Sequence, residues 1–227
     1  MIKAVQKAVG AIVDGSIGTQ TMSDIAVRLK ADCFPLGLTI YSQPVIIAKD
    51  CVPMSVKAPL SQYANAISGS FNNGGGPCSI LITGGKVICN LSCHYTANQS
   101  PESVIYRLTD GTFGIKRVRN TNELPGTVLW AVGGMGLLGN YDPNAEGFKG
   151  IFSDVLRKTG HTMIGVKNGY VYLVYCADMT AIQVNNFAKK LGLEMAVMLD
   201  GGHLAAINSE STRINTGTRQ LYVIQAR

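Results

Sequence analysis

The segment with the clearest chemical potential is Asp200-Gly201-Gly202, which directly follows the apolar run 195–199. A carboxylate at the end of a buried strand is partly desolvated, and two glycines leave backbone N–H groups open to a ligand. His203 follows at once, and an imidazole titrates near neutral pH, so proton transfer beside Asp200 is feasible. The alternative interpretation is an aspartate that begins a tight turn. The pattern favours a functional site at the end of this strand.

Two other glycine-containing segments also follow apolar runs. The first contains the small and polar residues Ser68, Gly69, Ser70 and Asn72. Hydroxyls, an amide and unhindered backbone can cradle a phosphate or a sugar hydroxyl, although such a loop taken alone is more often a plain turn. The second is Gly133-Gly134, which we expect to end a strand over residues 127–132. We expect the three junctions to converge on one pocket.

Four further residues are candidates at the start of strands and helices. His161-Thr162 opens a predicted strand, where a single histidine is more often structural than catalytic. Asp178 follows the next strand and could supply a second carboxylate. Its other interpretation is the N-cap of a helix, a role that Thr180 could also fill.

Turn residues and hydrophobic periodicity then locate the elements that must position these groups. Asn168-Gly169 between two apolar runs predicts a hairpin, and Gly84-Gly85 predicts another. The predicted strands are 36–47, 79–83, 86–89, 127–132, 162–166, 170–176, 194–199 and 221–224; the predicted helices are 59–66, 152–158 and 180–191. Many strands and few helices, not in strict alternation, predict an α+β fold. We expect one compact domain over residues 1–227, with a mixed or antiparallel sheet and a few flanking helices.

Composition limits the class of ligand. The chain of 227 residues is 46% hydrophobic and 15% charged, which excludes a disordered protein. Its net charge of +6 favours an anionic partner, but the basic residues neither cluster nor alternate with aromatic residues, so no nucleic acid is expected. We expect a small anionic ligand, such as a sugar phosphodiester or a nucleotide. The possibility of a homo-oligomer that pairs through a sheet edge stays open.

The lengths of the apolar runs and the spacing of the cysteines bear on location and on cofactors. No apolar run is long enough to cross a membrane, and residues 8–13 are short for the core of a signal peptide, so we expect a folded N-terminus and a cytoplasmic protein. Cys89, Cys93 and His94 have no second ligand pair, so we expect no metal, no cofactor and reduced cysteines. The chain also lacks the Gly-x-Ser-x-Gly, phosphate-loop and dinucleotide-binding glycine patterns.

The same segments, in the same order, resemble the phosphodiester glycosidases, the family of the mannose-6-phosphate uncovering enzyme and its bacterial and phage relatives. The matching segments are 66–72, 130–134, 161–166, 179–191 and 197–202. The last, Val197-Met198-Leu199-Asp200-Gly201-Gly202, is the most specific. The resemblance covers about residues 59–207.

The sequence departs from the family pattern at the positions that would contact substrate. Ser68 and Met198 stand where the family has Asn, His161 stands where it usually has Arg, and His203-Leu204-Ala205 replaces Gly-Ser-Ser. A histidine cannot reproduce a bidentate contact between arginine and phosphate. The resemblance therefore leaves the substrate open.

The resemblance implies a hydrolase that cleaves a glycosidic bond to a phosphodiester-type leaving group. It implies Asp200 as the key carboxylate, Asp178 as the second, and His161 or His203 as the group that contacts phosphate or moves a proton. The implied ligand-binding residues are Ser68, Gly69, Ser70, Asn72, Gly133, Gly134, Thr162, Thr180, Gly201 and Gly202. The alternative is a binder without turnover that sequesters a nucleotide or sugar phosphate, as a phage protein could do with a host signalling nucleotide.

Overall fold

The computed structural model describes residues 35–73, 75–92 and 100–227. Within these ranges the chain forms a ten-stranded and a five-stranded sheet, and every strand pairing is antiparallel. The strands of the larger sheet are β1 (Leu36–Ile40), β2 (Gln43–Ala48), β5 (Leu81–Thr83), β6 (Lys86–Cys89), β7 (Glu102–Leu108), β8 (Phe113–Val118), β9 (Val128–Gly136), β10 (Thr159–Lys167), β11 (Tyr170–Met179) and β12 (Met195–Gly201). Those of the smaller sheet are β3 (Cys51–Pro59), β4 (Ala66–Ser68), β13 (Ile207–Asn208), β14 (Arg213–Ile214) and β15 (Arg219–Ala226).

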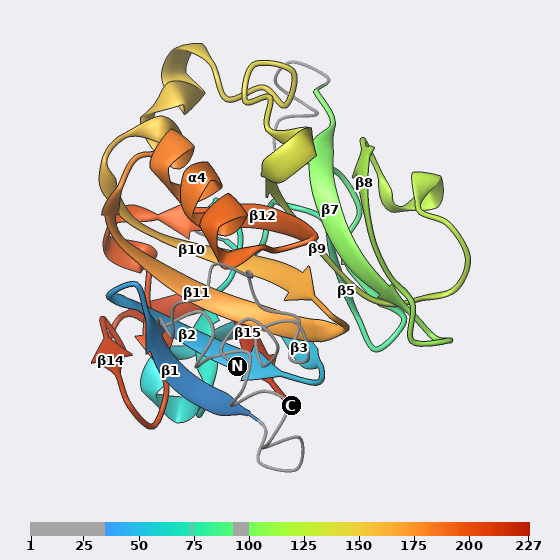
Figure 1. Cartoon of the computed structure of the whole chain (residues 1–227). Helices are drawn as coiled ribbons and strands as arrows, with labels where there is room; N and C mark the ends of the chain where they lie inside the picture. The colour runs from blue at the N-terminus through green and yellow to red at the C-terminus, as the bar shows by residue number, and fades with distance from the viewer. Residues whose placement is uncertain (1–34, 74, 93–99) are drawn as a thin grey trace, which may run out of the picture.

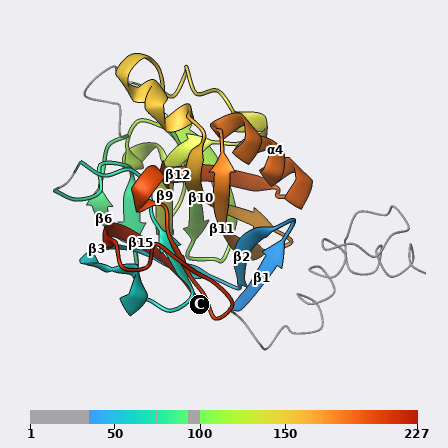
Figure 2. The same cartoon turned by 90° about the vertical axis from the view of Figure 1, so that its left-hand side faces the viewer.

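The larger sheet runs in the order β1-β2-β11-β10-β12-β9-β5-β6, and β7 joins it through β9 and carries β8. The smaller sheet runs in the order β14-β13-β4-β15-β3. Figures 1 and 2 show the helix α4 (Ala181–Leu191) along strands β10–β12, with the smaller sheet below them. The central strands are thus covered on both faces.

Alternate residues of the central strands enter two separate cores. In β10, Met163 packs with the α4 core, whereas its neighbour Ile164 packs with the core that faces the smaller sheet. In β12, Met198 and Val197 divide in the same way. Successive side chains of a strand point to opposite faces, so a strand that is buried on both sides needs apolar residues at every position. This explains the uninterrupted apolar run that leads to Asp200.

The predicted helix 180–191 is confirmed as α4. Thr180 is its N-cap and forms a capping box with Gln183, and Gly192 ends it in the left-handed conformation with φ 70°. Both predicted hairpins are confirmed, as β5–β6 and β10–β11. The predicted strands 194–199 and 221–224 correspond to β12 and β15.

Other predictions were wrong. The predicted single strand 36–47 is a hairpin. Tyr41 and Ser42 form its turn with positive φ values of 49° and 65°, and the turn contains no glycine that would have indicated it. Helices 59–66 and 152–158 are the 3-10 segments η1 (Leu60–Gln62) and η4 (Gly150–Leu156). The fold is therefore mostly antiparallel β-sheet, with α4 as the α-helix of the described residues, and α+β with a few helices describes it only coarsely.

Some predictions fall outside the described residues, and some strands of the structure had not been predicted. The N-terminal segment, Cys93 and His94 lie outside the described residues. Cys51, Cys78, Cys89 and Cys176 are free cysteines in the structure, and the predicted reduced state stays a prediction. Strands β3, β7, β8, β13 and β14 had no prediction. Among the described residues, no helix has the length and apolar composition needed to span a membrane.

Gly133-Gly134 lies inside β9 and does not end it as predicted. A Cβ atom at Gly134 would lie 2.5 Å from the carbonyl oxygen of Met198, so only glycine lets β9 approach β12 this closely.

We predict that Gly134→Ala lowers the free energy of unfolding by about 1–3 kcal/mol, measured by chemical denaturation. Gly217→Ala is the control, because a Cβ there meets nothing within 4 Å. Equal stability of the two variants would contradict the close approach.

Candidate active site

Asp200 is the next-to-last residue of β12, beside the irregular start of β10. The pairing of β10 with β12 shifts register between His161 and Met163, and His161 faces Gly201. The Asp200 carboxylate accepts hydrogen bonds from the backbone N–H of Gly201 (2.7 Å) and from the Asn72 side-chain amide (3.2 Å). The predicted site residues Asn72, His161, Asp200 and Gly201 therefore lie together.

The protonation of Asp200 is displaced toward neutral pH. Burial raises the pKa of this carboxyl from 3.8 to about 6, against the lowering effects of the Gly201 N–H, of the nearby His203 and of Arg157. The negative charge of Asp154 also raises it. A carboxyl group that titrates near neutral pH can serve in either protonation state, a property that is concentrated at catalytic sites.

Ser68 and Thr162 form a buried polar link beneath Asp200. The Thr162 hydroxyl lies 3.1 Å from the carbonyl oxygen of Ser68 and 3.4 Å from that of Asp200, so its one proton serves these two acceptors. The Ser68 hydroxyl oxygen accepts the backbone N–H of Ala206 at 3.0 Å. These contacts tie β4, from the smaller sheet, to the end of β12. Both hydroxyls are fully or almost fully buried, so they hold the site from behind.

His161 is a buried side chain under the rim of the site. Its Nε2 lies 3.1 Å from the carbonyl oxygen of Arg157, which makes Nε2 the protonated nitrogen. Burial lowers the pKa of His161, and the Arg157 carbonyl partly opposes this effect. The ring lies so close to Gly201 that a Cβ there would be 2.6 Å from Nδ1. A neutral imidazole thus joins η4 to the Asp200 turn.

A pocket of about 180 Å³ opens over Asp200. Its lining includes Asp154, Arg157, His161, Asp200, Gly202 and His203. Arg157 pairs with Asp154 at 2.9 Å, and both side chains are more than half exposed. This volume is smaller than the roughly 300–1,000 Å³ that is typical of sites for drug-sized ligands, so it suits one small polar group. The pocket therefore presents cations and carboxyl groups to a small polar ligand.

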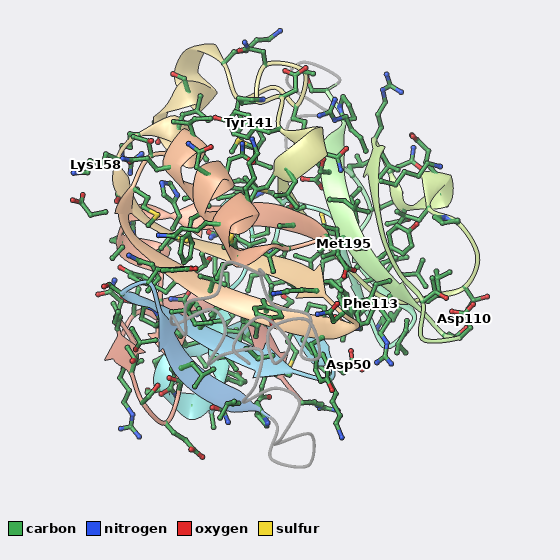
Figure 3. All side chains as sticks on the ribbon, in the orientation of Figure 1. Asp50, Asp110, Phe113, Tyr141, Lys158 and Met195 are labelled. Carbon is green, nitrogen blue, oxygen red and sulfur yellow. The ribbon has the colours of Figure 1, made fainter. Side chains whose placement is uncertain are left out.

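Two predicted residues lie outside this pocket. The Asp178 side chain is 74% exposed and pairs with Lys158 at 2.9 Å. Lys158 lies at the periphery of the molecule in Figure 3. Asp178 lines a separate pocket of about 370 Å³ beside α4, and Thr180 caps that helix. The second carboxylate of the Asp200 pocket is Asp154.

The remaining predicted residues lie behind the pocket. Gly69 packs under the Tyr222 ring, where a Cβ would lie 2.2 Å from a ring carbon, and Ser70 is buried. Gly134 lies against β12, and Gly133 lies against Ser79 and the carboxylate of Glu102. These glycines allow close packing of strands and side chains around the site. The sequence pattern had indicated contact with a ligand for them.

Sequence reasoning did not single out Asp154, Arg157 or Glu102. Arg157 lies in a predicted helix, and its position four residues before His161 was the available signal. Glu102 is fully buried and had no signal, because its partners Ser79 and Ile80 are distant in sequence. In residues 35–73, 75–92 and 100–227, no three His, Cys, Asp or Glu side chains are placed to hold a metal ion.

With this geometry in place, comparison with known proteins identifies the class. The chain belongs to the phosphodiester glycosidase family, whose sequence model matches residues 61–220. A search of curated protein sequences gave no match. Family membership suggests phosphodiester glycosidase activity.

Two solved structures are similar to the chain. The first is the zebrafish N-acetylglucosamine-1-phosphodiester alpha-N-acetylglucosaminidase catalytic domain, auto-inhibited by its pro-peptide, with a TM-score of 0.63 and 15% identity over 86% of this chain and 81% of that chain. The second is a hypothetical protein from Synechocystis, with a TM-score of 0.51 and 14% identity over 84% of this chain and 60% of that chain. At these identities the likeness shows the fold alone.

The raised pKa of Asp200 makes a prediction about stability. Since the folded state binds this proton more tightly than the unfolded chain, the ionised carboxyl reduces stability as pH rises from about 4 to about 6. We predict that Asp200→Asn raises the free energy of unfolding at pH 7.5 by about 1–2 kcal/mol and that this gain disappears by about pH 4. Denaturant titrations at the two pH values measure it. A gain that does not depend on pH would contradict the assigned pKa.

Proposed function

We propose that this chain hydrolyses the glycosidic bond of a sugar phosphodiester at the pocket over Asp200. The observation that carries the proposal is the partly buried Asp200 carboxyl, with a pKa of about 6, in a pocket that also contains Arg157 and His203. Membership of the phosphodiester glycosidase family supports the reaction class. The finer assignment to Asp200 rests on the geometry.

The chemistry follows from the leaving group. A phosphate diester oxygen leaves readily as an anion, so the reaction needs little proton donation and depends on stabilising positive charge at the sugar carbon. The ionised Asp200 is suited to that task, because its two hydrogen bonds fix the carboxylate and partial burial strengthens its field. It either directs a water molecule or attacks the sugar carbon itself.

Arg157 and His203 complement the negative charge of the phosphate. Both line the same pocket as Asp200, and both carry exposed side chains that a ligand can reach. An arginine can bind phosphate oxygens through two parallel N–H groups. The Asp154 carboxylate accepts a hydrogen bond from one Arg157 guanidinium nitrogen at 2.9 Å, which orients the guanidinium at the pocket edge. We infer that Arg157 supplies the phosphate contact that His161, held beneath the rim, is not placed to make.

We predict that the wild-type protein cleaves one or more members of a panel of sugar phosphodiesters and that Asp200→Asn slows this cleavage by about 10²–10⁴-fold. Rates should also fall as pH drops below about 6, because the reactive carboxylate becomes protonated. Product release followed by mass spectrometry measures both effects.

Two matched variants sharpen the assay. Asp110→Asn changes an exposed aspartate that does not line the Asp200 pocket, and it should retain wild-type turnover. Figure 3 places Asp110 at the opposite side of the view from Lys158, the neighbour in sequence of the pocket residue Arg157. Asp178→Asn should also remain near wild type, because Asp178 lies outside the Asp200 pocket. Undiminished cleavage by Asp200→Asn would reject the assigned site. A ligand that is retained intact by the wild-type protein, with no product, would favour a sequestering protein.

A further inference from the structure

We propose that Glu102 is a positioning residue of this site, which holds the loop between β4 and β5 so that Asn72 contacts Asp200. The proposal rests on the proposed function only in treating Asp200 as the reactive group. Glu102 lies on β7, away from the pocket lining, and it acts through the loop.

Glu102 is anchored to the end of this loop by two strong hydrogen bonds. Its side chain is fully buried, and its carboxylate oxygens accept the Ser79 hydroxyl at 2.7 Å and the backbone N–H of Ile80 at 2.6 Å. The carbonyl oxygen of Ile80 in turn accepts the N–H of Gly133 at 2.8 Å. A buried carboxylate is tolerated where several donors converge on it. The loop end is therefore fixed to both β7 and β9.

Gly133 creates the space that this carboxylate occupies. A Cβ atom at position 133 would lie 2.4 Å from a Glu102 carboxylate oxygen and 2.6 Å from the Ser79 hydroxyl. The sheet thus omits a side chain where the acid and its donor meet. This arrangement gives the Gly133 position a structural purpose that a ligand contact does not explain.

Contacts between the two arms of the loop, residues 69–73 and 75–80, connect the Glu102 anchor to Asn72. The N–H of Cys78 donates to the carbonyl oxygen of Phe71 at 3.0 Å, and Asn72 and Pro77 form an antiparallel bridge. Cys78 directly precedes Ser79, so the arm held by Glu102 is the arm that pairs with Asn72. The Asn72 amide then donates to the Asp200 carboxylate at 3.2 Å. A path of hydrogen bonds, linked by the backbone of residues 78–79 and 71–72, therefore joins Glu102 to Asp200.

Other titratable groups also face Asp200, and they come from other elements. They are His161 from β10, His203 from the turn after β12, Asp154 from η4, Arg157 directly after η4, and Cys78 from the loop. The Cys78 thiol interacts with both Glu102 and Asp200; burial chiefly raises its pKa to about 12, so it stays neutral. A variant of Glu102 leaves all five side chains in the protein. The Asn72 contact is the one that we expect it to change.

The test measures the titration of Asp200 directly, without any substrate. In Glu102→Gln the neutral amide keeps both partners, with its oxygen accepting from Ile80 and its NH₂ donating to the Ser79 hydroxyl. Neither bond is then assisted by a charge, so the loop end and the Asn72 amide are held less firmly. Because an N–H donor favours the ionised carboxylate, the Asp200 midpoint should rise by roughly half a unit. NMR of protein labelled with ¹³C at the aspartate carboxyl groups reports this midpoint, and Asp200→Asn identifies the signal.

Three comparisons make the result specific. Ser79→Ala is a milder variant of the same anchor and should shift the midpoint in the same direction. Glu146→Gln is the control, because Glu146 is another fully buried acid whose donors Ser103, Gly136 and Arg117 lie outside the loop. It should reduce stability without moving the Asp200 midpoint. In an Asn72→Ala background, Glu102→Gln should cause no further shift, as a shared path requires.

An unchanged Asp200 midpoint in folded Glu102→Gln and Ser79→Ala would overturn the proposal. An equal shift in Glu146→Gln would also overturn it, because the effect would then be general. The proposed function fails separately, through absence of turnover in the wild-type protein. A shifted midpoint in a protein without turnover would retain Glu102 as the positioning residue of a binding site.

Discussion

The partial burial of one carboxyl group, that of Asp200, is the constraint on which the rest of the site depends. Burial raises its pKa to about 6, and an isolated charge there would be costly without donors. The Gly201 N–H and the Asn72 amide donate hydrogen bonds to the two oxygens, and the nearby Arg157 and His203 lower the pKa of Asp200. The polar groups around Asp200 therefore serve chiefly to stabilise its charged form.

The surrounding fold makes this burial possible. Strand β12 is covered by α4 on one face and by the smaller sheet on the other, so its end reaches the surface only at the Asp200 turn. Glycines at 69, 133, 134 and 201 remove side chains where strands, rings and carboxylates meet. The resulting close packing fixes the groups behind the pocket, as a preorganised site requires. The stability lost by ionising Asp200 is the expected cost of such a site.

Local signals in the sequence were sufficient for some elements and insufficient for others. Asn168-Gly169 and the capped helix 180–191 carry strong local rules, and both were predicted correctly. The turn at Tyr41-Ser42 was missed, because a two-residue hairpin turn with positive φ at both positions is normally marked by Asn or Gly, and neither is present here. Gly133-Gly134 was interpreted as a strand end, because a glycine required for close approach looks the same in sequence as a glycine required for a turn.

The same distinction applies to the site. The position of Asp200 after an apolar run was a local pattern, and the structure places His161, His203 and Gly202 around the same pocket. Asp178 lies elsewhere, because strand β10 separates its strand from β12. Glu102 accepts hydrogen bonds from Ile80 and Ser79, which lie 22 and 23 positions away in the sequence. These contacts form only because the fold places β7 beside the loop. Contacts between distant segments were therefore the part that sequence could not supply.

The most direct test of the central claim is to identify the bond that breaks. A sugar phosphodiester that the protein turns over would be hydrolysed in H₂¹⁸O, and the released phosphate monoester would be examined by mass spectrometry. Cleavage at the sugar carbon, as proposed, adds the water oxygen to the sugar and leaves the phosphate without ¹⁸O. Incorporation of ¹⁸O into the phosphate would show attack at phosphorus and contradict a glycosidase mechanism at Asp200.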